Sequence, residues 1–462
     1  MPGYRQFAGR YPPGERIGGI PVEGLTRDQA NARLLNAYAL PVEIHYAGGV
    51  FQASPKTLGF QLDTAAMLDS ASRDLSLRYW DYLWNRSPAS RSIPLQASID
   101  SGQIESYLEQ EVAPRYDRAA LPAAPVPGGL DFTQGRTGTR LDVNRAVPRI
   151  ESALRSLTGR RVTLDSLPVA PPRPSMQNLQ ILLQQVLVTS GYGGVAEVYL
   201  ADLGSGQHID FAMNQGQPVA PGLAFTAAST IKIPVMISVL RRAPDPIPQK
   251  ILSLVREMIE ASDNPSTDKV VQIVIDQNLG PLDVTADMQA LGLKNTFWAG
   301  YFYDGAPLLR RFETPANQRQ DVSTQPDQYN QTTAAEMGTL LEDIYRCAKK
   351  GDGPLVSTFP GQISQAKCQE MIHLLEGNKL PVLIKSGVPD TITVGHKHGW
   401  IQAPDGSLHD ISDVALVFTP GGDYAMTVYL NHPGLFDPAN ILVAHLSEVV
   451  YHYFNLPAPR SP

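Results

Sequence analysis

Ser229 and Lys232 stand three residues apart in a Ser-Thr-Ile-Lys segment. Apolar residues on both sides predict a buried helix that begins near Ser229, and positions i and i+3 of a helix share one face. Because burial lowers the pKa of a lysine, a neutral Lys232 amine could accept the proton of the Ser229 hydroxyl. The pair therefore predicts a serine nucleophile with a lysine base. The same spacing at Ser364 and Lys367 lies in a polar segment, where we expect no chemistry.

A second polar group, Ser262-Asp263-Asn264, is followed by Pro265 and a further predicted helix. A serine hydroxyl at a helix junction can relay a proton to a leaving nitrogen, and an asparagine amide can hold a substrate carbonyl. By itself, this pattern is more typical of a helix N-cap. Both interpretations stay open on this motif alone.

A third group, Lys397-His398-Gly399, enters a predicted strand and is followed by Trp400. Side chains alternate along a strand, so Lys397 and Gly399 share a face. A glycine there lets a ligand lie close against the backbone. The pair His396 and His398 has no third partner at the usual metal-ligand spacing, so we expect neither a metal nor a cofactor.

The three motifs follow one another on a predicted helix, a helix junction and a strand. On these motifs, residues 177–462 resemble the class A β-lactamases and related penicillin-binding serine hydrolases, over about three-fifths of the chain. The resemblance implies an acyl-enzyme mechanism on β-lactam or peptidoglycan-peptide amide bonds. Ser229 would be the nucleophile, Lys232 its base and Ser262 a further catalytic residue.

The resemblance also implies how a substrate is held. Asn264 would bind its amide, and the backbone N–H groups of Ser229 and Trp400 would form the oxyanion hole. Lys397 and His398 would bind its carboxylate. His398 stands where the family usually has Thr or Ser, so an imidazole N–H would replace the hydroxyl donor.

Glu313 and Asn317 match the Glu-x-x-x-Asn pair that holds the deacylating water in class A enzymes. They lie in a long polar loop from Phe297 to Gln331. The alternative is an ordinary solvated glutamate. With an active Glu313 the protein would be a β-lactamase-type hydrolase that confers antibiotic resistance, and without it a D,D-peptidase or cell-wall amidase that β-lactams merely acylate. A third alternative is a non-catalytic cell-wall binding protein on the same fold.

The two cysteines, Cys347 and Cys368, are predicted to form a disulfide. Cys347 ends one predicted helix, and Cys368 begins the next. The intervening turn is rich in Gly and Pro, so the helices should fold back as neighbours and bring the two residues within reach of a bond.

Net charge and hydropathy limit the class of partner. The formal charge is −7, which argues against nucleic acid. No apolar run reaches the ~18–20 residues that a membrane span needs, and the N-terminus does not have the pattern of a signal peptide. Because the substrates of the resembled family lie outside the cytoplasm, we expect an extracellular or cell-envelope protein. Any membrane anchor would lie outside this sequence.

The N-terminal region, residues 1–165, shows a weak repeat of Gly-x-x-Leu-Asp followed by a helical pattern, at Gly59 to Asp63 and at Gly138 to Asp142. With a helix start at Thr26, these elements resemble peptidoglycan-binding repeats found ahead of VanW-type domains. The repeats would span about 20–95 and 96–165 and bind the cell wall. A plain α+β spacer is the alternative.

The predicted fold class is α+β. A proline-rich linker over residues 166–176 is expected to separate the N-terminal region from the domain 177–462. A Pro/Ala/Gly-rich stretch, residues 121–129, is expected as a loop inside the N-terminal region. The order of helices and strands in residues 177–462 predicts an antiparallel five-stranded sheet with a helical lobe beside it.

Overall fold

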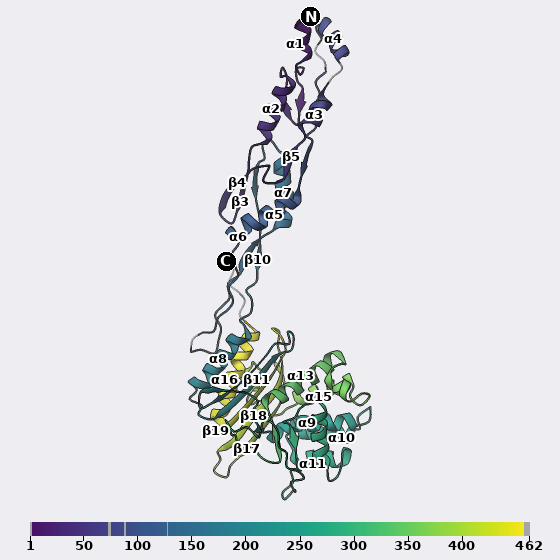
Figure 1. Ribbon diagram of the computed structural model, residues 1–462. Helices are drawn as coiled ribbons and strands as arrows, with labels where there is room; N and C mark the ends of the chain where they lie inside the picture. Colours follow the sequence, from purple (N-terminus) through teal and green to yellow (C-terminus); the bar gives the residue numbers. More distant parts are fainter. Residues whose placement is uncertain (1, 73–74, 87–88, 127, 457–462) are drawn as a thin grey trace. The chain divides into compact units, whose positions relative to one another are not determined.

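The computed structural model describes residues 2–72, 75–86, 89–126 and 128–456 (Figure 1). Its contacts divide the chain into two compact units. Among the described residues, unit 1 holds those up to Leu121 together with Gly135–Pro172. Unit 2 holds Pro122–Gln134 and the residues from Arg173 onward. Both units mix helices with strands, so the fold class is α+β.

Unit 1 consists of short helices and small sheets. Its helices are α1 (Pro2–Ala8), α2 (Arg27–Tyr38), α3 (Thr64–Ala71), α4 (Leu75–Leu83), α5 (Ser101–Tyr107), α6 (Ala113–Tyr116) and α7 (Val143–Arg155). Its strands are β1 (Arg16–Ile17), β2 (Ile20–Pro21), β3 (Val42–Tyr46), β4 (Gly49–Ala53), β5 (Phe60–Leu62), β6 (Ser92–Ile93), β7 (Ala97–Ile99), β8 (Gly138–Leu141), β9 (Arg161–Thr163) and β10 (Ser166–Val169).

A strand, an aspartate and a helix follow one another three times in unit 1. Asp63 caps α3 after β5, and Asp142 caps α7 after β8, each by accepting a hydrogen bond from a backbone N–H of the first turn. Asp100 does the same between β7 and α5, a third case that was not expected from the sequence. Thr26 forms a capping box at the start of α2. Each of these helices is thus fixed at its N-terminus by a local side chain.

Two segments that were expected to be a linker or a loop make specific contacts with other parts of the fold. Ser166–Val169, expected as the start of the linker, pairs as β10 with β8. Pro168 is tolerated because β10 is the edge strand of this two-stranded ladder. Residues 121–129 were expected as a loop inside the N-terminal region. All of the described residues among them except Leu121 belong to the segment Pro122–Gln134, which groups with unit 2 because Ala123 and Phe132 are buried in the core of that unit.

Unit 2 is built on a six-stranded sheet in the order β13-β12-β11-β19-β18-β17. All its pairings are antiparallel. The strands are β11 (Val195–Asp202), β12 (His208–Asn214), β13 (Gln217–Val219), β17 (Thr393–Gln402), β18 (Leu408–Phe418) and β19 (Tyr424–Gly434). The sixth strand, β13, was not expected. It forms because Gln215 and Gly216 both take a positive φ and turn the chain back after β12.

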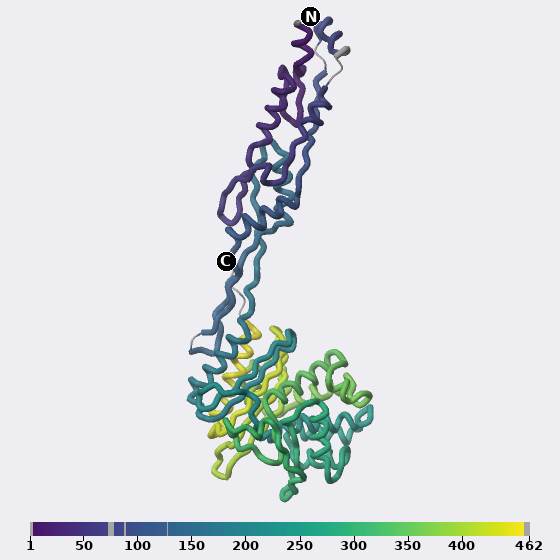
Figure 2. The backbone as a smooth tube through the Cα atoms, in the orientation of Figure 1, coloured from purple at the N-terminus to yellow at the C-terminus, as the bar shows by residue number. Residues whose placement is uncertain are grey.

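Helices cover both faces of this sheet. One face packs against α8 (Met176–Thr189) and α16 (Phe436–Phe454), which lie side by side although they come from opposite ends of the unit (Figure 2). The other face packs against the helical lobe, beginning with α13 (Ala334–Lys350). Alternate residues of β11 therefore enter different cores: Val198 and Leu200 face α8 and α16, whereas Tyr199 and Ala201 face the lobe.

The remaining elements form the lobe and its loops. They are α9 (Lys232–Arg242), α10 (Gln249–Glu260), α11 (Asn264–Val274), α12 (Gly280–Ala290), α14 (Pro354–Thr358), α15 (Gln365–Glu376), β14 (Phe225–Thr226), β15 (Phe297–Trp298) and β16 (Asn330–Thr332). The strands β14, β16 and β15 form a small sheet in that order. Its first strand ends three residues before Ser229, so this sheet fixes the approach to the predicted nucleophile.

Cys347 and Cys368 are joined by a disulfide between α13 and α15, with their Cα atoms 5.8 Å apart. Replacing both with alanine is expected to lower the free energy of unfolding by roughly 3 kcal/mol, because the unfolded chain would lose a 21-residue cross-link. Denaturant titration of the oxidised protein and of the double variant measures this loss. Wild-type protein held in reductant is the control. If reduction leaves the unfolding midpoint unchanged, the cross-link does not stabilise the fold.

Candidate active site

Ser229 lies in a 3-10 turn, Ala228–Ile231, that leads directly into α9. The helix therefore begins at Lys232, three residues later than expected. Ala228 takes a positive φ of 48°, a conformation that costs energy for a residue with a side chain. The turn is held by the Thr230 hydroxyl, which lies 2.9 Å from the Tyr429 hydroxyl of β19. The half-buried Ser229 is thus presented on a strained turn that tertiary contacts maintain.

Lys232 lies beneath Ser229 and is fully buried. Its Nζ donates to Ser229 Oγ (3.1 Å), to the Ser262 carbonyl oxygen (2.7 Å) and to Asn264 Oδ1 (2.6 Å). Burial lowers the pKa of Lys232 from 10.5 to about 7, against the opposing influence of Asp263 and Asp268. A substantial fraction of this amine is therefore neutral near pH 7 and able to accept a proton.

Ser262 lies between two lysines. Its Oγ accepts a hydrogen bond from Lys397 Nζ (2.9 Å) and lies 3.4 Å from Lys232 Nζ. Ser262 has a positive φ of 60°, and Asp263 caps α11 immediately after it. Burial holds the pKa of Lys397 well below its ordinary value, and the neighbouring Lys232 lowers it further. The two amines and the hydroxyl form a continuous path for a proton.

Gly399 brings β17 against the turn that carries Ser229. A Cβ at this position would stand 2.8 Å from the Ser229 backbone nitrogen and 3.0 Å from the Ala227 carbonyl oxygen. The close approach is therefore between two parts of the protein itself, whereas the sequence pattern had indicated space for a ligand. Any side chain at position 399 would push the strand from the nucleophile.

With this geometry in place, a match to a known protein family decides what the domain is. Residues 242–454 match the sequence model of the beta-lactamase enzyme family. This stretch of unit 2 is a β-lactamase-family domain. The match begins after Ser229 and Lys232 and includes Ser262, Asn264 and Lys397. No curated protein matches the sequence.

Solved structures also align with part of this chain at low identity. A PBP-A variant in an acyl-enzyme complex with penicillin G is 20% identical, with a TM-score of 0.42 over 62% of this chain and 99% of that one. A β-lactamase from Xanthomonas campestris pv. campestris is 19% identical, with a TM-score of 0.41 over 59% and 96%. A β-lactamase from Sphaerobacter thermophilus is 19% identical, with a TM-score of 0.43 over 62% and 100%.

His398 does not join Lys397 in the site of the β-lactamase-family domain. Lys397 pairs across the sheet with Val414, which faces the lobe, whereas Val394 and Trp400 face α16. By alternation, His398 faces α16 as well. Its Nδ1 lies 3.2 Å from Asn378 Nδ2, and its ring stacks on Trp400 at 4.8 Å. The expectation that His398 binds a substrate carboxylate beside Lys397 does not fit this placement.

Glu313 and Asn317 line one pocket with Phe297 and Gln331. The Asn317 amide donates to Gln331 Oε1 (2.9 Å), and Gln331 pairs with Thr226 at the end of β14. Asn317 is thus tied to the segment that leads to Ser229. The Glu313 side chain is exposed. The structure connects Asn317 to the approach of the nucleophile and leaves Glu313 facing solvent.

Sequence reasoning missed two residues that shape the lysine site. The Asp268 carboxylate accepts hydrogen bonds from the backbone N–H groups of Phe302 (3.0 Å) and Tyr303 (2.9 Å). This contact holds the Phe302 ring with its centroid 5.1 Å from Lys232 Nζ. The sequence signal was an acidic residue, Asp268, close to the apolar Val270 and Val271 in α11.

Among the described residues, no group of His, Cys, Asp and Glu side chains could hold a metal ion. Within the same ranges, no helix has the length and apolar character needed to cross a membrane.

The second Ser-x-x-Lys segment, Ser364 to Lys367, has a structural role. Lys367 donates to the carbonyl oxygens of Ala243 and Gln362, and Ser364 caps α15. Both residues of this second Ser-x-x-Lys are fully engaged in structural contacts.

Proposed function

We propose that the protein is a serine hydrolase that forms an acyl-enzyme at Ser229 on β-lactam or peptidoglycan-peptide amide bonds. The observation that carries the proposal is the hydrogen bond between Lys232 Nζ and Ser229 Oγ, made by a buried amine whose pKa is lowered to about 7. A lysine that only supported the fold would gain nothing from this shift, because burial of an amine with a lowered pKa costs stability.

The proposed reaction begins when neutral Lys232 Nζ accepts the proton of Ser229 Oγ. The oxygen then attacks the amide carbonyl carbon, and the tetrahedral oxyanion is stabilised by backbone N–H groups, among them that of Ser229. When the C–N bond breaks, the leaving nitrogen receives a proton from Ser262 Oγ, which recovers it from Lys232. Asn264, whose Oδ1 accepts a hydrogen bond from Lys232 Nζ, would hold the substrate amide. Water then hydrolyses the ester.

The exposed Glu313 favours a second candidate for the final step. If Glu313 does not activate water, the protein is a D,D-peptidase or cell-wall amidase that β-lactams acylate without efficient turnover. Incubation with a fluorescent penicillin, followed by removal of free reagent, separates the candidates. A label lost within seconds to minutes indicates a β-lactamase, whereas a label that persists for hours indicates the peptidase. An unlabelled protein overturns both.

For the hydrolase in which Glu313 activates the water, Glu313→Gln is expected to prolong the acyl-enzyme without preventing its formation, because a neutral amide cannot take a proton from the attacking water. We expect the lifetime of the adduct to increase by about 10²- to 10⁴-fold, measured by intact mass after the reagent is removed. Asp304→Asn, an exposed carboxylate in the same long loop, is the matched control. Equal lifetimes in the two variants would make Glu313 an ordinary loop residue.

For unit 1 we propose binding to the cell wall, in a protein that acts outside the cytoplasm. The support is the strand-aspartate-helix repetition at Asp63 and Asp142, which corresponds to the repeat that resembles peptidoglycan-binding modules. Sedimentation of the full chain with insoluble purified peptidoglycan tests this. Recovery of all the protein in the supernatant would leave unit 1 as a spacer.

A further inference from the structure

Large apolar side chains stand exposed together at α4. Trp80 is 59% exposed, Leu83 49% and Trp84 66%. Trp80 and Trp84 are four residues apart, and the Trp84 backbone N–H donates to the Trp80 carbonyl oxygen, so the helical turn continues and both rings lie on one face. Exposed apolar residues elsewhere in unit 1, such as Leu40 and Val50, lie in other elements. This local concentration indicates a surface that contacts something.

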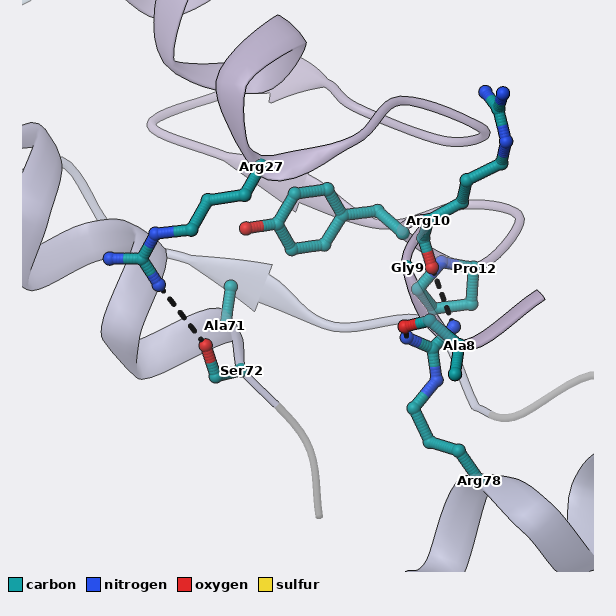
Figure 3. A pocket seen from close by; sticks show the side chains of 9 residues that line it. Ala8, Gly9, Arg10, Pro12, Arg27, Ala71, Ser72 and Arg78 are labelled. Atoms are coloured by element: carbon teal, nitrogen blue, oxygen red, sulfur yellow. Dashed lines mark hydrogen bonds between the residues drawn. The ribbon is translucent and has the colours of Figure 1, made fainter. Parts of the chain in front are cut away.

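The exposure does not come from a poorly packed helix. The inner face of α4 packs against α1, with the rings of Tyr4 and Tyr79 5.2 Å apart and those of Phe7 and Tyr82 5.4 Å apart. Arg78 adds hydrogen bonds from α4 to the carbonyl oxygens at the end of α1, among them that of Ala8 (Figure 3). Since α1 and its aromatic residues already cover one side of α4, the two tryptophans remain outside.

This surface is also strongly basic. The α1–α4 pair, defined as the described residues within 2–10 and 78–91, contains four exposed arginines (Arg5, Arg10, Arg86 and Arg91), the buried Arg78 and one acidic residue, Asp81. The whole chain, by contrast, has a net charge of −7. Arg86 lies over the Trp84 ring at 5.6 Å, so cationic and aromatic groups are interleaved. Arg10 and Arg78 of the pair line a pocket together with Arg27 (Figure 3).

Tryptophan and leucine beside arginine suit the boundary between lipid headgroups and acyl chains, because indole rings are amphipathic and guanidinium groups bind phosphate. A neutral glycan could stack on the rings but would gain nothing from the positive charge. A second copy of the α1–α4 pair would be repelled, because both surfaces are positively charged. We propose that the α1–α4 pair docks on an anionic lipid surface, with Trp80, Leu83 and Trp84 entering the interface and the exposed arginines of the pair contacting lipid phosphates. This inference does not depend on the proposed hydrolase activity.

The test is co-sedimentation of the full chain with vesicles of phosphatidylcholine alone or mixed with phosphatidylglycerol. We expect binding to the mixed vesicles only, weakened by salt because screening shortens the reach of the arginines. The double variant Trp80→Ser/Trp84→Ser should bind at least about tenfold more weakly. The matched control is Leu40→Ser/Val50→Ser, which removes exposed apolar residues elsewhere in unit 1 and should bind like wild type.

Tryptophan fluorescence gives a second readout. Trp298 is fully buried and Trp400 is half-buried in unit 2, so a blue shift on vesicle binding that is lost in the double variant comes from Trp80 and Trp84. Circular dichroism checks that the double variant is folded. Three results would overturn the proposal: no sedimentation with anionic vesicles, equal sedimentation of wild type and the tryptophan variant, or binding of the pair only to purified glycan. A concentration-dependent dimer that disappears in the tryptophan variant, without vesicle binding, would show that a second copy occupies the surface.

Discussion

Ser229→Ala is expected to abolish covalent labelling of the protein by penicillin. Without the hydroxyl no oxygen at this position can attack the carbonyl, and among the described contacts Lys232 Nζ reaches no other side-chain hydroxyl than those of Ser229 and Ser262. Wild-type protein should gain the mass of one penicillin, and the variant should gain none. The measurement is intact-mass spectrometry after incubation with excess reagent.

The chain offers its own control for this experiment. Ser364 begins a second Ser-x-x-Lys but serves as the N-cap of α15. Ser364→Ala should keep the penicillin adduct while lowering the free energy of unfolding by about 1 kcal/mol through loss of the cap. An adduct that survives in Ser229→Ala, or one that disappears in Ser364→Ala while the protein remains folded, would refute the assignment of the nucleophile.

Lys232→Met is expected to slow acylation by about 10²- to 10⁴-fold, the usual contribution of a positioned general base. Because the neutral amine is the reactive form and its pKa is about 7, the wild-type rate should rise with pH through this value and level off above it. Below it the rate should fall by about tenfold per pH unit. Stopped-flow measurement of acylation across the pH range gives both results.

Lys367→Met is the matched control, because Lys367 is also buried but binds only backbone carbonyl oxygens. It should retain the wild-type pH profile. A Lys232→Met protein that keeps both the rate and the inflection near pH 7 would show that another group is the base.

The Lys232→Met substitution should also change the stability of the fold, and the sign of this change depends on pH. The pKa of Lys232 is lower in the folded protein than its ordinary 10.5, so between about pH 7 and 10.5 the unfolded chain binds more protons. The buried amine therefore weakens the fold most below pH 7, and this penalty is relieved as the pH rises to 10.5. Lys232→Met should accordingly raise the melting temperature more at pH 6 than at pH 10.

Local sequence was enough to predict those elements whose signal is itself local. The helix ending at Phe454 and the strands that contain Lys397 and Val414 are rich in apolar residues, because the helix buries one face and the two strands are buried on both faces. Thr26, Asp63 and Asp142 predicted helix starts because a cap acts within its own turn. The predicted fold class is confirmed, and the family predicted for residues 177–462 is matched over residues 242–454.

The sequence was less informative where a segment depends on a distant partner. The strand β10 required β8 to pair with, and Pro122–Gln134 required the core of unit 2 to bury Ala123 and Phe132. Neither partner can be identified from composition, since a proline-rich stretch has the same local preferences in a linker and in an edge strand.

For the site, the sequence by itself determined which residue types were available: a serine and a lysine one helical turn apart, a second serine, and a lysine two residues before a glycine. Tertiary structure decided which of them meet. It placed Ser262 between two lysines from different elements and brought Gly399 onto the Ser229 backbone. It turned His398 to the other face of the sheet. The physical reason is that proton transfer and backbone contact act over about 3 Å, a distance set by packing of elements far apart in the chain.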